Sequence, residues 1–158
     1  MKTRAGFVSN SSTCSFQIYG VTFESPSEMF DSMKSTAHIE AMREKILKKV
    51  QDSGELDDPE RDLTKLSAVD LIKLACEEVG DYMIEELTYD LDESLVPGLG
   101  VSRLGDYDYS TYVGRNFSGI GEDETPRQLK DGVVKALTEI FGEEVATAVA
   151  MHDGTYQC

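Results

Sequence analysis

The sequence has few residues suited to metal or thiol chemistry. It contains three cysteines, Cys14, Cys76 and Cys158, and two histidines, His38 and His152. The cysteines are far apart, and none has the spacing of a zinc site. Cys76 falls on the expected buried face of a helix, where a thiol acts as a small hydrophobe. We therefore expect reduced thiols, no metal, no cofactor and no catalytic pairing of Cys14 with a histidine.

Long apolar runs are also absent. No segment approaches the roughly 20 apolar residues that span a bilayer. The charged start, Met1 to Arg4, leads into serines rather than into the apolar stretch of a signal peptide. These absences predict a soluble protein of the cytoplasm that makes no membrane contact.

Positive charge is scarce. The chain has 15 Lys and Arg residues against 30 Asp and Glu residues, a formal net charge of -15. Affinity for nucleic acid comes from lysine and arginine that displace counterions, so direct binding of DNA or RNA is disfavoured. Two functional interpretations of the charge are a basic protein partner and mimicry of nucleic acid. The third interpretation is a surface that is merely well solvated.

The remaining composition is that of an ordinary folded protein. The chain has 158 residues, of which 40% are apolar. A chain of this length buries roughly two-thirds of the surface that its unfolded form exposes. We therefore predict one acidic domain over residues 1–158.

The first half of the chain predicts one strand followed by helices. Residues 16–23 are rich in aromatic and β-branched residues, with a kink or bulge at Gly20. Ser25-Pro26-Ser27-Glu28 predicts a capped helix start. The apolar stripes that follow change phase near Ser35-Thr36, which indicates two helices or one broken helix. Ser67 predicts the N-cap of a further helix, with a buried face of Val69, Ile72, Cys76, Val79, Met83 and Leu87.

The second half predicts two strands, a helix and a last strand. The two strands span 99–104 and 107–113, with a turn at 105–106. Thr125-Pro126-Arg127-Gln128 predicts a capping box. The helix that it opens ends at Gly142, and its expected buried residues are Leu129, Val133, Leu137, Ile140 and Phe141.

Alternating valine, threonine and methionine then predict a strand over 145–151, with a turn at Asp153-Gly154. The order of the elements predicts an α+β fold. We expect a small, mostly antiparallel sheet with three to four helices packed on one face.

One stretch concentrates the negative charge. No lysine or arginine occurs between Lys73 and Arg103. Like charges at i,i+4 cost a helix a few tenths of a kcal/mol per pair, which core packing easily offsets. We predict that this acidic segment is the contact for a basic protein partner; its residues are Glu77, Glu78, Asp81, Glu85, Glu86, Asp90, Asp92 and Glu93.

A second acidic pattern is Asp106-Tyr107-Asp108-Tyr109-Ser110, with the spacing D-x-D-x-S. In phosphatases of the haloacid dehalogenase type, aspartates at this spacing supply a nucleophile and an acid beside magnesium. Those motifs follow a buried apolar strand, whereas Ser102-Arg103-Leu104-Gly105 precedes this one. The other interpretation is a hairpin turn with two exposed acids.

The most distinctive segment is the N-terminal one. Small polar residues from Ser9 to Ser15 lie between Phe7-Val8 and Phe16, which predicts a tight polar loop with an apolar anchor at each end. Its hydroxyls can cap helix ends or satisfy backbone groups. A modification or processing site and a partner contact are the alternatives. The signature residues are Phe7, Val8, Ser9, Asn10, Ser11, Ser12, Ser15 and Phe16.

This signature resembles the N-terminus of many small, uncharacterised proteins of bacteriophages and bacteria, in which an unbroken serine run ends at phenylalanine. Thr13 and Cys14 depart from that run. A looser similarity extends to Tyr112-Val113-Gly114, Asp123-Glu124-Thr125 and Lys130. The group has no established activity, so the resemblance implies a phage-type origin and no catalytic chemistry.

These observations predict a non-enzymatic, phage-type accessory protein that binds a protein partner with a basic surface. It would modulate the host from within the host cytoplasm or belong to the virion. The alternative is an acidic nucleic-acid mimic that inhibits a host nucleic-acid-binding or defence protein. The second alternative is a metal-dependent hydrolase that uses Asp106 and Asp108.

Overall fold

A four-stranded sheet and six α-helices make up the described part of the chain. The computed structural model describes residues 13–52, 62–80, 83–84, 87, 95–102 and 110–157, without the side chains of 13–16 and 154–157. The elements are β1 (Thr13–Phe23), α1 (Pro26–Asp31), α2 (Ala37–Glu40), α3 (Arg43–Asp52), η1 (Leu63–Lys65), α4 (Ala68–Glu78), β2 (Gly100–Ser102), β3 (Thr111–Asn116), η2 (Phe117–Gly119), α6 (Pro126–Ile140), α7 (Glu143–Thr147) and β4 (Ala150–Gln157).

The sheet is antiparallel, and β1 is its central long strand. The strand order is β2-β3-β1-β4. β1 pairs with β4 from Thr13 opposite Gln157 to Gly20 opposite Ala150. Only the second half of β1 pairs with β3. The predicted α+β fold with a small antiparallel sheet is therefore confirmed.

The two faces of the sheet differ in what covers them. Val21 of β1, Val113 of β3 and Val101 of β2 lie side by side in register, and all three are buried in the main core. Successive residues of a strand point to opposite faces, and the neighbouring positions Ile18 and Tyr112 form a separate small cluster. The helices α1 and α6 thus cover one face of the sheet.

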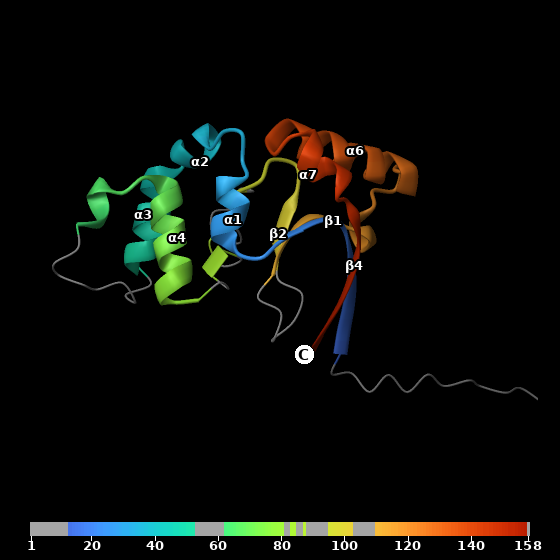
Figure 1. Ribbon diagram of the computed structural model, residues 1–158. Coiled ribbons are helices and arrows are strands. Elements are labelled where there is room, and N and C mark those ends of the chain that lie inside the picture. The colour runs from blue at the N-terminus through green and yellow to red at the C-terminus, as the bar shows by residue number, and fades with distance from the viewer. Residues whose placement is uncertain are drawn as a thin grey trace, which may run out of the picture.

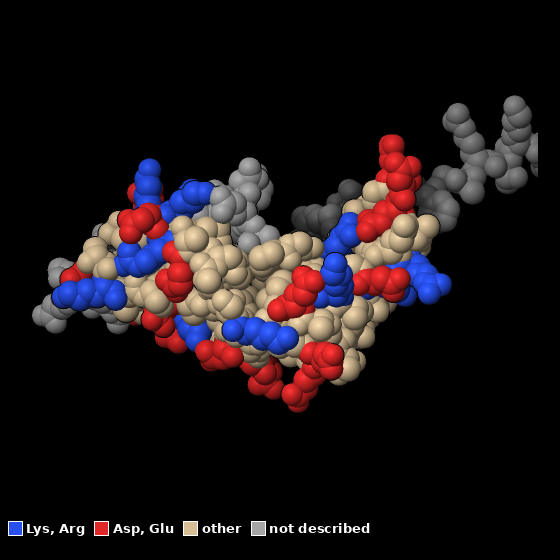
Figure 2. Space-filling view, turned by 90° about the horizontal axis from the view of Figure 1, so that it is seen from above, with Lys and Arg blue, Asp and Glu red and all other residues tan. Residues whose placement is uncertain are grey.

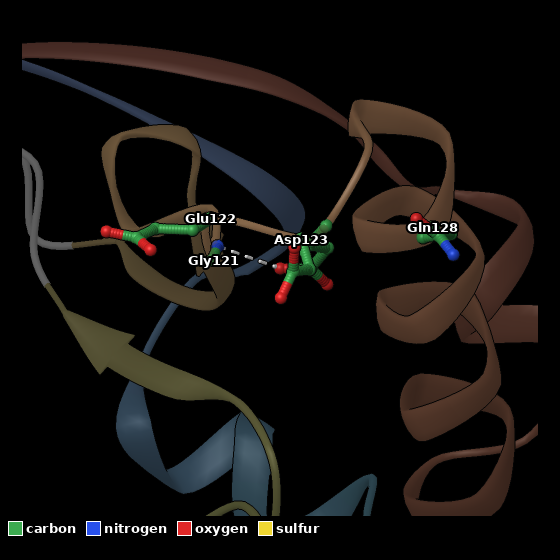
Figure 3. A pocket seen from close by; sticks show the side chains of 5 residues that line it. Gly121, Glu122, Asp123 and Gln128 are labelled. Carbon is green, nitrogen blue, oxygen red and sulfur yellow. Dashed lines mark hydrogen bonds between the residues drawn. The ribbon is translucent and has the colours of Figure 1, made fainter.

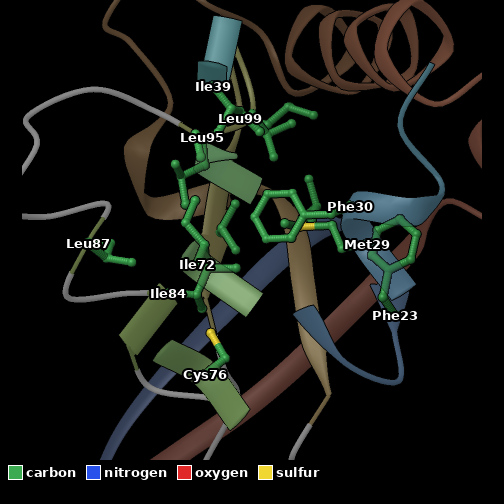
Figure 4. Packing of buried hydrophobic residues seen from close by; sticks show 14 of the residues in the cluster. Phe23, Met29, Phe30, Ile39, Ile72, Cys76, Ile84, Leu87, Leu95 and Leu99 are labelled. Atoms are coloured by element: carbon green, nitrogen blue, oxygen red, sulfur yellow. The ribbon is translucent and has the colours of Figure 1, made fainter. Parts of the chain in front are cut away.

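The helices lie in two groups. Figure 1 shows α6 and α7 together beside β1 and β4, and α2, α3 and α4 together at the other end of the molecule. Phe23 of β1 contacts Phe141, at the end of α6, with ring centroids 5.2 Å apart. Figure 4 shows Met29 and Phe30 of α1 beside Phe23 and close to Ile72 of α4, so that the core is continuous between the groups.

All three predicted N-caps are present. Ser25 and Ser67 each accept a hydrogen bond from the backbone N–H three residues on. Thr125 forms a complete capping box with Gln128, in which each side chain accepts from the other residue's backbone N–H, at 3.2 and 2.8 Å. A reciprocal contact from Glu28 to the N–H of Ser25 would complete a capping box here, but the carboxylate of Glu28 accepts from the N–H of Glu24 instead.

Polar contacts between residues far apart in the sequence join α2 and α3 to the start of α4. The carboxylate of Glu40, at the end of α2, accepts from the first two N–H groups of α4, at 3.0 and 3.4 Å. Arg43 donates to the carbonyl oxygens of Leu66 and Thr64. These contacts satisfy groups that a helix end leaves unpaired, and they fix α4 against α2 and α3.

Three local predictions are wrong. Residues 143–147 form the helix α7 and not part of a strand. Asp153 and Gly154 lie within β4, opposite Gln17 and Phe16, and not in a turn. The helix that begins after Ser67 ends at Glu78, because Gly80 has a φ of 133° that a helix cannot continue through.

Gly20 marks a close approach of two strands and not a bulge. It pairs directly with Gly114 of β3. A β-carbon at Gly20 would lie 2.7 Å from the Cα of Gly114 and closer still to the carbonyl oxygen of Val113. Both obstacles are backbone atoms, so the strands would have to separate to accept any side chain.

We predict that Gly20→Ala lowers the free energy of unfolding by about 3 kcal/mol or more, because overpacking here displaces backbone. Gly132→Ala in α6 is the matched control, since a β-carbon there meets nothing within 4 Å. It should raise the stability by roughly 0.5–1 kcal/mol. Urea unfolding of both variants measures the difference, and equal effects would contradict the close approach.

Thr111 provides a second stability test. Its side chain is fully buried, and among the described residues its hydroxyl is the one buried side-chain polar group without a hydrogen-bond partner. We expect Thr111→Val to leave the free energy of unfolding unchanged or to raise it by about 1 kcal/mol. Thr125→Val, which removes the capping box, should instead cost about 1 kcal/mol. A loss of that size in Thr111→Val would mean that the hydroxyl is hydrogen-bonded.

Candidate functional site

The acidic segment begins on the last turn of α4. Glu77 and Glu78 are exposed there, whereas Ala75 and Cys76 of the same turn are buried. A helix C-terminus carries partial negative charge and favours cations, so two glutamates at this end do not serve the stability of α4. The other predicted contact residues lie outside the described residues; they are Asp81, Glu85, Glu86, Asp90, Asp92 and Glu93.

Elsewhere, many described acids have structural partners. Asp31 pairs with Lys73 at 2.5 Å and ties α1 to α4. Glu40 caps α4, and Glu124 pairs with Arg115 at 2.6 Å. Among the described residues Glu77 makes no ion pair. The fold therefore distinguishes acids that hold elements together from acids that are available to a partner.

The charges on one large face of the molecule are mixed. Figure 2 shows Lys and Arg side chains interspersed with Asp and Glu side chains over the face that lies uppermost in Figure 1, where α2, α6 and α7 lie. A continuous array of acids spaced like phosphates is not present on this face. Of the described surface, this face gives no support to mimicry of nucleic acid.

The described part of the N-terminal signature is a strand and not the predicted loop. Thr13, Cys14 and Ser15 belong to β1, opposite Gln157, Tyr156 and Thr155. Ser15 and Phe16 are therefore strand residues, because β4 offers them a complete pairing partner that the local sequence does not reveal. The rest of the signature lies outside the described residues; it comprises Phe7, Val8, Ser9, Asn10, Ser11 and Ser12.

The second patch of the resemblance has structural roles. Gly114 forms the close pair with Gly20, and Thr125 forms the capping box of α6. The ammonium group of Lys130 lies 5.1 Å from the ring centroid of Tyr19 and 5.7 Å from that of Phe117. Such cation–π contacts stabilise by roughly 0.5–1 kcal/mol at exposed sites. These residues of the patch therefore position β1, β3 and α6.

Arg115 and Glu124 form the best-defined ion pair near this patch. Two guanidinium nitrogens of Arg115 donate to the two carboxylate oxygens of Glu124, at 2.6 and 2.8 Å. This bidentate hydrogen bond lowers the pKa of Glu124 and raises the pKa of Arg115. The pair holds the loop before α6 against β3.

A shallow hollow lies beside this pair. It is lined by Gly121, Glu122, Asp123, Glu124 and Gln128. Figure 3 shows the side chains of Glu122 and Gln128 pointing away from each other, while a carboxylate oxygen of Glu124 accepts from the N–H of Gly121 at 3.4 Å. Nowhere in the described residues do three or more His, Cys, Asp or Glu side chains meet in a way that could hold a metal ion.

The structure gives no geometric support to the hydrolase hypothesis or to a pairing of Cys14 with a histidine. Asp106 and Asp108 lie outside the described residues. His38 is engaged at 2.8 Å with the carbonyl oxygen of Leu95. In the β1–β4 ladder Cys14 pairs with Tyr156 and His152 with Ile18. Positions 14 and 152 are therefore four residues apart along the ladder, about 13 Å.

Comparisons with protein-family models, curated proteins and solved structures give no match to this chain. In the part of the chain that the structure describes, no helix combines the length and the apolar character needed to cross a membrane.

The Arg115–Glu124 pair predicts a specific acid sensitivity. Because the folded protein lowers the pKa of Glu124, the pair stabilises the fold above the ordinary glutamate pKa of about 4.3 and loses this effect as the pH falls through the lowered value. Glu124→Gln should therefore lower the melting temperature at pH 7 and have a smaller effect at about pH 3. Glu122→Gln, without an ion pair among the described residues, is the control; an equal pH response of both variants would contradict the prediction.

Proposed function

We propose that the chain is a non-enzymatic accessory protein of phage type that binds a protein partner through a basic surface of that partner. Its place of action is the host cytoplasm, as a modulator of the host, or the virion. The phage-type origin rests on the N-terminal resemblance alone. The protein–protein contact rests on the distribution of negative charge.

The observation that carries this proposal is the exposed pair Glu77 and Glu78 at the start of the acidic segment. Their negative charges repel the partial negative charge of the α4 C-terminus. The two glutamates are followed in the sequence by further acids, with no lysine or arginine before Arg103. A partner with lysine and arginine side chains would reduce the repulsion among these acids. Long-range attraction of this kind chiefly raises the association rate and the specificity.

Two other functions have less support. A nucleic-acid mimic needs acids in a continuous array, and the face in Figure 2 carries both signs of charge. A metal-dependent hydrolase needs Asp106 and Asp108 to converge with further ligands, and both aspartates lie outside the described residues. Binding of a basic protein needs neither condition.

The test is a capture experiment with the immobilised protein and a bacterial lysate, at low and high salt. We expect a captured protein to be released at high salt, because exposed charge pairs are screened. The double variant Glu77→Lys/Glu78→Lys should reduce the capture at least roughly tenfold. The captured protein is then purified, and its affinity is measured for the unsubstituted protein and for the double variant.

Glu122→Lys is the matched control, since it makes the same kind of charge change at an exposed position before α6. It should retain most of the capture. Capture that survives high salt, or that both variants reduce equally, would contradict a contact centred on the acidic segment. Absence of any captured protein would overturn the proposed function itself.

A further inference from the structure

Among the described strands, β4 has one edge that no other strand pairs with. The sheet ends at β4, which pairs with β1 on one side and with no other strand among the described residues. Alternate N–H and C=O groups of an edge strand point away from the sheet and can pair with another extended chain. At eight residues β4 is longer than the opposite edge strand β2, which has three.

The β4 edge has few of the usual protections. Natural proteins block exposed edges with charged side chains, especially lysine, with proline, with bulges, with very short strands or with a covering helix or loop, and β4 has a single acid, Asp153. The β4 sequence has no proline and no lysine, and its register with β1 runs without interruption. Ala150, Met151 and Asp153 are exposed, Met151 at 39%. An added strand would therefore gain backbone hydrogen bonds and cover apolar surface.

The acids on β4 and before it in the sequence select its occupant. Asp153 is exposed on β4 itself, and no lysine or arginine follows Lys135 in the sequence. The acids after it are all exposed, and none forms an ion pair among the described residues; they are Glu139, Glu143, Glu144 and Asp153. A second copy of the chain would bring like charges together at this edge. A segment with lysine or arginine brings opposite charges.

We propose that the β4 edge is a docking site for an extended, basic segment of a partner protein, which adds to the sheet as a fifth strand. Backbone hydrogen bonds supply affinity in this mode of recognition, and side chains supply selectivity. The inference rests on the proposed function, a protein partner with a basic surface, and adds a second contact. Figure 1 shows that β4 and α4 lie far apart on the molecule, so the two contacts are separable.

The first experiment uses a fluorescent ten-residue peptide of alternating lysine and threonine as the probe. We expect it to bind in fluorescence anisotropy and to slow amide hydrogen exchange in residues 150–157. The same peptide with every backbone amide N-methylated keeps its charge but loses its donors, and it should bind at least roughly tenfold more weakly. A glutamate–threonine peptide should not bind. Failure of the lysine peptide to bind, or equal binding of the N-methylated form, would overturn the proposal.

The second experiment changes the protein. Asp153→Lys should lower the affinity for the lysine–threonine peptide by roughly tenfold or more, and Asp153→Asn should lower it by less. Glu77→Lys should leave this affinity unchanged. Melting temperatures show whether each variant is folded. If Glu77→Lys lowers the affinity for the lysine–threonine peptide and neither Asp153 variant does, the peptide binds the acidic segment. That result would overturn the edge site and leave the proposed function unchanged. Absence of any protein captured from the lysate, together with specific peptide binding at β4, would overturn the proposed function and leave the edge site standing.

Discussion

The close pairing of Gly20 with Gly114 is the constraint on which the sheet depends. At this pair the backbones of β1 and β3 are too near for a β-carbon on either strand. The pair sets the register that brings Val21 opposite Val113 and Phe23 opposite Thr111. Because side chains alternate between faces, a slip of one residue would move Val21 and Val113 out of the core that α1 and α6 cover. The helices have an apolar surface to pack on only in this register.

Signals that act over a few residues are readable in the sequence, and signals between distant segments are not. The N-caps at Ser25, Ser67 and Thr125 depend on contacts within one turn, and all three are present. The strand predicted over 145–151 is partly wrong because a short alternating run suits a helix as well as a strand. Gly142, with a φ of 107°, ends α6, and α7 begins directly after it. The turn expected at Asp153-Gly154 does not form, because these residues pair with β1. Asp153 lies opposite Gln17, which is 136 positions earlier in the chain.

The candidate site shows the same division. The sequence alone reveals where acids gather, and Glu77 is exposed on α4. It does not reveal which acids elsewhere are already engaged. Glu40 caps a helix that begins 28 residues later, and Asp31 pairs with Lys73, so neither is available to a partner. These roles depend on the packing of α1, α2 and α4, which no local pattern encodes. The edge position of β4 among the described strands is likewise invisible in the sequence, because strand order is a property of the whole sheet.

The exposed acids that follow Lys135 and the exposed acids at the end of α4 differ from the rest of the described surface in how little of the core depends on them. None of them belongs to the hydrophobic core cluster, so their replacement should leave the main packing unchanged. Surface substitutions of this kind usually alter stability by less than about 0.5 kcal/mol. Arg115, Glu124 and Lys130 have no such freedom, since they join β3, the loop before α6 and the rings of Tyr19 and Phe117. A protein built in this way can change its partner at the charged surfaces while the ion pair, the cation–π contact and the glycine pair keep its fold.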